Sequence, residues 1–171
     1  IEGPITPRAI FLTVIVDDAV QGAFDVVRGV LGGLSDLVKT VGFRAPTMRL
    51  TCTVGVGANA WDHIFGDAKP QELRAFTRVQ GDMHTAVSTP GDLLFHIRAE
   101  REDLAYEFER LLLQDLGAAV KAVDEVAGFR YFDNRDLLGF VDGTANPIGP
   151  NLPASALVGE EDPDFAGGSY I

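Results

Sequence analysis

One aspartate is a candidate for acid–base chemistry, because glycines bracket it and apolar residues precede it. Asp142 lies between Gly139 and Gly143, and Phe140 and Val141 come immediately before it. Glycine lets the backbone adopt a positive φ or approach a flat ligand closely. Apolar neighbours remove water from a carboxylate, which favours its protonated form and would let Asp142 exchange a proton near neutral pH. The spacing alone also fits an ordinary Asp-Gly turn, in which the carboxylate binds only its own backbone.

Other residues with chemical potential are weaker candidates. We expect His63 and His84 to be packing or loop hydrogen-bonding residues, and His96 to be a structural histidine on a strand. The acidic run 160–164 could bind a cation, but a solvated loop is the commoner outcome for such a cluster. The single cysteine, Cys52, excludes an internal disulfide and a cysteine-rich metal site. Its place in an apolar strand favours a buried, inert thiol.

Composition limits the classes of partner. The 171 residues are 46% hydrophobic and 23% charged, as in a soluble globular domain, and the length fits one domain or one domain with an arm. The net charge of −11 argues against nucleic acid and against an anionic membrane surface, because like charges repel. No apolar run reaches the roughly 18 residues of a membrane-spanning helix. The start Ile1-Glu2-Gly3-Pro4 lacks the features of a signal peptide, so a cytoplasmic location is the default expectation.

Hydrophobic spacing predicts four strands and two long helices. Strands are expected near 9–16, 48–56, 92–99 and 119–126, and helices near 19–40 and 102–116. The pair Gly32-Gly33 predicts a break or kink in the first helix, because glycine has a low helix propensity. A short helix at 60–65 and a helical turn or two at 70–76 complete the prediction.

The order strand, helix, strand, strand, helix, strand predicts the fold class. It is the order of the α+β, ferredoxin-like (βαββαβ) arrangement, in which two helices cover one face of an antiparallel sheet. We divide the chain into a ferredoxin-like module, 1–132, followed by a long C-terminal loop and arm, 133–171. The second part is rich in Gly, Pro, Asp and Asn, and loops of this length in a compact domain are more often functional than not.

The residues around Asp142 resemble those of a known family. Residues 139–143, Gly-Phe-Val-Asp-Gly, match the GxxDG signature of dye-decolorizing peroxidases. The resemblance extends to the stretches 129–138, 144–147 and 162–170, and upstream to 7–16, 41–44, 60–62, 84–85 and 90–100. It covers almost the whole chain and favours an acid–base role for Asp142 over an ordinary turn.

The resemblance implies a haem b held by a histidine, with Asp142 on the distal side, where peroxide binds. There Asp142 would take a proton from one peroxide oxygen and deliver it to the other, which promotes O–O cleavage. By their positions in the motif, the residues that would line the haem edge are Val141, Gly143, Thr144, Ala145 and Asn146. Many bacterial members carry glutamate where this chain has Ala145, which leaves its substrate preference open, including any metal oxidation.

The family's proximal histidine and distal arginine lie in a second ferredoxin-like half, after the strand that Tyr170 is expected to begin. None of the three histidines matches the axial-ligand position, so no metal ligand is assigned to this chain. The resemblance therefore implies the N-terminal half of a two-module, dimeric α+β barrel-like peroxidase. This half is expected to be inactive on its own.

The implied activity is the reduction of hydrogen peroxide with oxidation of a dye or another organic donor. The implied partners are peroxide, an organic reductant, the missing C-terminal half and further copies in a homo-oligomer. Some bacterial relatives are packaged in protein nanocompartments through a C-terminal tail, and packaging stays open for this chain. Two alternatives also stay open: a non-enzymatic ferredoxin-like assembly or binding domain, and a protein that handles haem or iron without peroxidase turnover.

Overall fold

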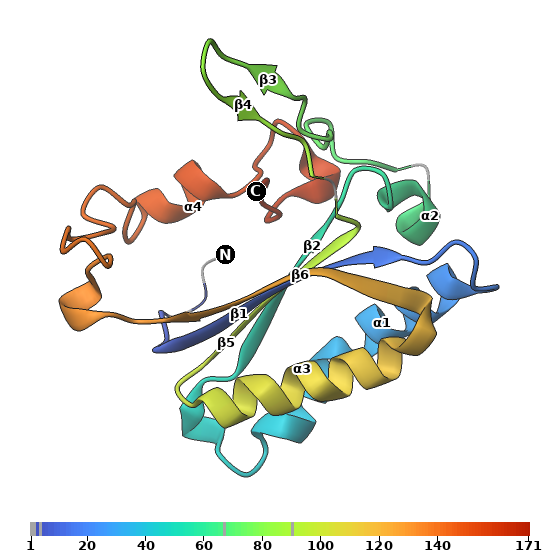
Figure 1. Ribbon diagram of the computed structural model, residues 1–171, viewed down its shortest axis with the longest axis horizontal. Helices are drawn as coiled ribbons and strands as arrows, with labels where there is room; N and C mark the ends of the chain where they lie inside the picture. The colour runs from blue at the N-terminus through green and yellow to red at the C-terminus, as the bar shows by residue number, and fades with distance from the viewer. Residues whose placement is uncertain (1–2, 4, 67, 90) are drawn as a thin grey trace.

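The main sheet of the protein has four antiparallel strands in the order β2-β5-β1-β6. The computed structural model describes residue 3 and residues 5–66, 68–89 and 91–171. The four strands are β1 (Arg8–Val16), β2 (Thr51–Val56), β5 (Leu93–Ala99) and β6 (Val120–Phe129). β1 and β5 therefore lie at the centre of the sheet, and β2 and β6 form its two edges (Figure 1).

Two long helices cover one face of this sheet. α1 (Ala23–Gly42) and α3 (Glu102–Leu116) pack against each other below it in Figure 1. Alternate strand residues point into this layer, because successive side chains of a strand face opposite sides. On β5, Phe95 and Ile97 are fully buried, and the helices close the core with Val27, Phe108 and Leu112.

The ferredoxin-like prediction is confirmed, including the placement of both long helices on one face of an antiparallel sheet. The bounds of the strands and helices agree with the expected ones to within a few residues. Two segments interpreted from the sequence contain residues outside the described ones. They are Pro90, before the third strand of the prediction, and residues 1, 2 and 4 of the N-terminal segment.

The predicted break at Gly32-Gly33 is wrong, because α1 continues through both glycines. Both lie on the exposed side of the helix, and a Cβ at either position would meet no atom within 4 Å. Leu31 and Leu34, on either side of the pair, pack against the core. The packing of this apolar face outweighs the low helix propensity of two glycines.

The segment from α2 onwards agrees with the prediction only in part. α2 (Trp61–Phe65) matches the short helix expected at 60–65, but 70–76 forms a single hydrogen-bonded turn and then extends. Its backbone is held by residues 157–171, the C-terminal arm, instead of by a helix. The extended chain leads into a two-stranded hairpin that the sequence did not predict, β3 (Val79–Gln80) and β4 (Thr85–Ala86).

Residues 133–171 are more structured than the predicted loop, since they contain α4 (Asn151–Ala156). Three-residue helical turns lie at Pro46–Met48, Gly117–Ala119, Phe132–Asn134 and Pro163–Phe165. α4, the C-terminal arm and the β3–β4 hairpin lie on the side of the sheet opposite α1 and α3 (Figure 1).

In the part of the chain that the structure describes, no helix has the length and apolar character needed to cross a membrane. The division of the chain at 132/133 stays a prediction.

Candidate active site

Strand β6 leads directly into the loop that carries Asp142, residues 130–150. The pairing of β6 with β1 runs along the whole strand, and just beyond it the N–H of Arg130 donates to the carbonyl of Pro7 at 2.9 Å. The chain then turns over the short helical turn at 132–134. The loop therefore starts from a fixed position on the edge of the sheet.

Beyond this point the chain folds back twice on itself. Arg135 forms a β-bridge with Tyr131 on one side and with Val141 on the other. The N–H of Asp142 donates to the carbonyl of Asn134 at 3.3 Å. The segment before Asp142 is thus held by backbone hydrogen bonds to the end of β6, rather than by burial of its side chains.

A tight turn at 136–139 shapes this loop. The N–H of Gly139 donates to the carbonyl of Asp136 (3.1 Å), and the N–H of Asp136 donates to the carbonyl of Phe140 (2.9 Å). Gly139 has a φ of +95°, which glycine adopts without a steric penalty. A turn followed by a glycine with positive φ is a common way to close a short β-hairpin. The Asp136 side chain also takes part, because it accepts the backbone N–H groups of Leu138 and Phe140.

The Asp142 carboxylate is exposed and makes no hydrogen bond with the residues that the structure describes. The turn that the sequence left open, with this carboxylate bound to its own backbone, is therefore not formed. Asp136 makes a turn of that kind six positions earlier in the sequence. The described residues also do not exclude water from Asp142 as expected. Its apolar neighbours Phe140 and Val141 are themselves 69% and 48% exposed.

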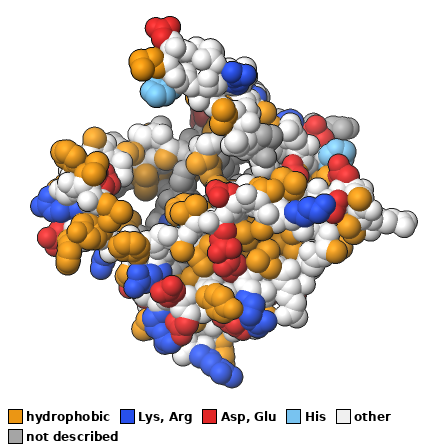
Figure 2. All heavy atoms as spheres, viewed as in Figure 1, with side chains coloured by type: hydrophobic (Ala, Val, Ile, Leu, Met, Phe, Trp, Pro, Cys, Tyr) orange, Lys and Arg blue, Asp and Glu red, His pale blue; other side chains and the backbone are white. Residues whose placement is uncertain are grey.

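The residues that follow Asp142 lie in one exposed stretch. Gly143 has a φ of +75°, and the N–H of Asn146 donates to its carbonyl at 3.2 Å, which closes a turn over Thr144 and Ala145. The stretch is continuous with the exposed apolar side chains of 137–141. Figure 2 shows hydrophobic side chains at the surface where Figure 1 places the loop between β6 and α4.

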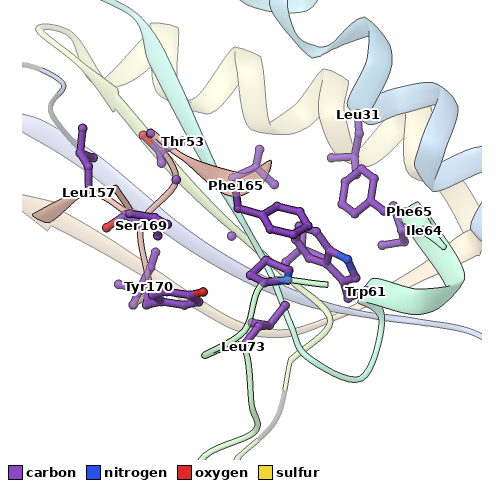
Figure 3. Close-up of a pocket in the computed structure, with 18 of the residues that line it drawn as sticks. Leu31, Thr53, Trp61, Ile64, Phe65, Leu73, Leu157, Phe165, Ser169 and Tyr170 are labelled. Atoms are coloured by element: carbon purple, nitrogen blue, oxygen red, sulfur yellow. The ribbon is translucent and has the colours of Figure 1, made fainter. Parts of the chain in front are cut away.

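The chain after α4 lies along an apolar groove between α2, the β2 edge and residues 70–73. Figure 3 shows Phe165 and Tyr170 of this arm beside Trp61 and Leu73. The cavity that stays open along the arm has a volume of about 970 Å³. The arm thus holds the far end of the Asp142 loop, as β6 holds the near end.

Asp162 joins this arm to the body of the fold. Its carboxylate accepts the N–H of Gln71 at 2.8 Å, and the residue is only 7% exposed. Beside it, the N–H of Glu72 donates to the hydroxyl of Tyr170 at 3.2 Å. The solvated loop expected at 160–164 is therefore wrong for Asp162. Among the described residues, no group of three or more His, Cys, Asp or Glu side chains is placed to hold a metal ion.

The three histidines belong to elements other than the Asp142 loop. His96 on β5 stacks on Phe11 with ring centroids 4.2 Å apart, and burial lowers its pKa. His63 on α2 stacks on Phe24 at 4.7 Å. His84 lies between β3 and β4, where its carbonyl accepts a backbone hydrogen bond. These positions agree with the packing and loop roles expected from the sequence.

Two other titratable groups in the body of the fold have raised pKa values. Cys52 is half-buried rather than buried, and desolvation of its thiol raises the pKa to about 12, in agreement with the inert thiol expected. Glu109 on α3 is 6% exposed, and its pKa is raised by burial and by the neighbouring charge of Glu125 on β6. The sequence analysis missed Glu109, although its spacing from the buried Ala105 and Leu112 places it on the inner face of the helix.

Two family models match the chain. The model described as "Dyp-type peroxidase, N-terminal" matches residues 1–130, which is most of the chain. The chain belongs to the Dyp-type peroxidase family. The model described as "Dyp-type peroxidase, C-terminal" matches residues 133–171. The resemblance noted from the GxxDG motif is therefore confirmed.

Individual relatives show how much of a Dyp-type peroxidase is present. A dye-decolorizing peroxidase of Mycolicibacterium paratuberculosis is 51% identical over 168 residues, which are 98% of this chain and 47% of that protein. A variant of DypB from Rhodococcus jostii, solved in complex with haem, is 48% identical with a TM-score of 0.92 over 96% of this chain and 53% of its own. The encapsulated DyP-type peroxidase of Mycobacterium smegmatis is 47% identical with a TM-score of 0.89, over 96% and 52% of the two chains. The chain spans about half the length of the curated relatives it matches.

Proposed function

We propose that this Dyp-type chain is the N-terminal half of a haem-dependent peroxidase, which reduces hydrogen peroxide and oxidises a dye or another organic donor. The observation that carries the proposal is the placement of Asp142. Its carboxylate stands exposed beside apolar side chains, on a loop whose backbone is held by hydrogen bonds. We assign Asp142 as the distal acid–base group.

The exposed stretch 141–146 fits one wall of a haem pocket. Val141 offers apolar surface to a flat ligand, and Gly143 presents backbone with no side chain. We assign Val141, Gly143, Thr144, Ala145 and Asn146 to the haem edge. No histidine occurs in 133–171, and the three histidines of the chain lie on α2, between β3 and β4, and on β5, so we assign the axial ligand to the part of the full-length protein that this chain does not contain. The DypB relative solved in complex with haem supports haem b as the cofactor.

Bound haem would supply the two electrons that O–O cleavage requires and would take up the oxygen atom that does not leave as water, and the organic donor would then return the electrons. The role of Asp142 is to move a proton. Its carboxylate accepts the proton from one oxygen of hydrogen peroxide and returns it to the other oxygen, which leaves as water. One side chain can serve both oxygens because they are bonded to each other. The hydrogen bonds that fix the loop keep the carboxylate in place between the two transfers.

The apolar surface beside Asp142 supports a second half as a partner. Large hydrophobic side chains are exposed around it, namely Leu137, Leu138, Phe140, Val141 and Ile148. Contiguous exposed apolar patches on a protein usually mark an interaction surface. We infer that the C-terminal half covers this loop in the full-length enzyme and removes water from Asp142. The N-terminal half alone is then inactive.

The remaining partners follow from the same family. The encapsulated relative supports a homo-oligomer, located in the cytoplasm or inside a bacterial protein nanocompartment. Ala145 carries no charge beside the proposed haem edge. We therefore favour an organic electron donor over a metal cation, which a carboxylate would attract more strongly.

The test is Asp142→Asn in the full-length protein. The amide cannot accept the peroxide proton, so stopped-flow mixing should show peroxide reduction slowed by about 10²–10⁴-fold with the haem content unchanged. Asp164→Asn, which changes an exposed carboxylate outside the loop, is the control and should react like wild type.

Three results would contradict parts of this proposal. A rate for Asp142→Asn within about threefold of wild type would remove Asp142 from the acid–base role, given the usual contribution of such a group. Haem binding by the wild-type protein without peroxide turnover would favour a haem- or iron-handling function. Failure of the full-length protein to bind haem would favour a non-enzymatic assembly domain.

A further inference from the structure

The carboxylate of Asp136 closes the turn that precedes Asp142. One of its oxygens, Oδ1, accepts the backbone N–H groups of Leu138 and Phe140, each at 2.9 Å. Both donors lie on the limb of the turn that continues to Asp142, residues 138–142. Hydrogen bonds to an ionised acceptor are stronger than those between neutral groups. Asp136 therefore constrains this limb more firmly than a neutral side chain would.

Two further contacts act on the same limb. The guanidinium of Arg135 donates to the carbonyl of Gly139 at 2.8 Å. The N–H of Asp136 donates to the carbonyl of Phe140 at 2.9 Å, so this aspartate holds the limb through both its backbone and its side chain. The limb is thus tied to residues 135 and 136 at three consecutive positions.

Asp142 depends on this limb for its position. Its carboxylate makes no hydrogen bond with the described part of the chain, and its backbone contact, from its N–H to the carbonyl of Asn134, is 3.3 Å long. The preceding side chains, Phe140 and Val141, are exposed and do not anchor it by burial. The direction of the carboxylate is therefore set by the backbone that leads out of the turn.

We propose that Asp136 is a positioning residue for Asp142. By accepting the two N–H groups, it fixes the limb that presents the acid–base carboxylate to peroxide. This inference rests on the proposed function of Asp142. Asp136 itself does not act on peroxide, because its carboxylate is engaged inside the turn. A displacement of about 1 Å in a reacting group can cost about 100-fold in rate, so small changes in this turn matter.

The experiment uses three substitutions in the full-length enzyme. Asp136→Ala removes the acceptor, whereas Asp136→Asn keeps an oxygen that can accept both N–H groups. Asp164→Ala is the matched control, since it removes an exposed carboxylate outside the loop. The first readout is amide hydrogen exchange at 138 and 140, which requires no activity. The second is kcat/KM for hydrogen peroxide.

We expect Asp136→Ala to speed exchange at both amides by about tenfold or more, as local opening of the turn becomes easier. Its kcat/KM for peroxide should fall by about 10- to 100-fold. Asp136→Asn should restore both readouts most of the way to wild type, and Asp164→Ala should change neither.

Wild-type exchange at 138 and 140 in Asp136→Ala, or a wild-type peroxide rate despite faster exchange, would overturn the proposal. So would faster exchange that extends to Leu12 and Phe95 in the core, because the whole fold would then be destabilised. Arg135→Met, which removes the donor to the Gly139 carbonyl, gives a second variant that should move both readouts in the same direction.

If Asp142→Asn itself keeps the wild-type rate, the proposed function and this inference both fail. If only Asp136→Ala keeps it, this inference alone fails.

Discussion

The rings of Trp61 and Phe165 meet edge-on, with their centroids 5.7 Å apart and their planes inclined by 75°. Trp61 belongs to α2, and its indole N–H also donates to the carbonyl of Ala68 at 2.7 Å. Phe165 belongs to the C-terminal arm. One side chain thus connects α2, the segment that follows it and the arm that holds the far end of the Asp142 loop (Figure 3).

Removal of either ring should therefore destabilise the arm. Trp61→Ala and Phe165→Ala should each lower the free energy of unfolding of the full-length protein by about 1–3 kcal/mol, less than for a fully buried ring. The double-mutant cycle should show a coupling of about 0.5–1.5 kcal/mol in urea unfolding. Phe43→Ala, which removes an exposed ring at the end of α1, should cost less than about 0.5 kcal/mol. Strict additivity of the two arm substitutions would show that the rings do not stabilise each other.

The second prediction concerns Asp162, which accepts the N–H of Gln71 in a buried position. Asp162→Ala leaves that N–H without its acceptor and should destabilise the protein by about 1–3 kcal/mol. Asp162→Asn keeps an acceptor oxygen and should cost less. Urea unfolding measures both, with Asp164→Ala as the exposed control. If Asp162→Ala and Asp164→Ala are equally stable, the contact with Gln71 does not hold the arm.

The fold could be predicted from the sequence because its signals are local and repeated. On β5 the apolar residues recur at every second position, and on α3 they recur at helical spacing. The Gly32-Gly33 pair was the exception. Its low helix propensity is also a local signal, but the packing of Leu31 and Leu34 against the core opposes it and outweighs it.

The candidate site could be predicted only in part. Asp142 was found because its motif is contiguous in the sequence. Asp162 was not recognised, because its partner Gln71 is 91 residues away and no local pattern records that pairing. Asp136 also had a local signal, an aspartate three residues before a glycine. A side-chain turn was predicted only as an alternative at Asp142, whereas the structure forms such a turn at Asp136.

The third prediction concerns the reactivity of Cys52. Burial raises the pKa of its thiol from an ordinary 9.0 to about 12, so the thiolate is about 1,000-fold rarer at pH 8 than in an unfolded chain. Iodoacetamide should label Cys52 very slowly in the folded protein and quickly in urea, as measured by mass spectrometry of its peptide. The unfolded sample is the internal control. Labelling of the folded protein at the unfolded rate would show that the strand exposes the thiol.

The fourth prediction concerns the effect of Glu109 on stability. Burial, with a contribution from Glu125, raises the pKa of Glu109 above its ordinary value of 4.5. The folded protein therefore binds this proton more tightly than the unfolded chain does. At pH values between the pKa of Glu109 in the unfolded chain and its pKa in the folded protein, the folded state holds more protons. The contribution of Glu109 to stability is therefore present below pH 4.5 and is lost as the pH rises through the folded pKa.

Glu109→Gln keeps the side chain neutral at every pH and removes this dependence. The variant should be more stable than wild type at pH 8, and the difference should shrink as the pH falls towards 4. Glu107→Gln is the control of opposite sign, because a hydrogen bond from Arg110 lowers the pKa of Glu107. That substitution should lose a little stability at pH 8 and none at low pH. Urea unfolding of the full-length protein at several pH values measures both variants. A Glu109→Gln profile parallel to wild type would mean that Glu109 is solvated in the complete enzyme, and that its burial on α3 does not set its protonation.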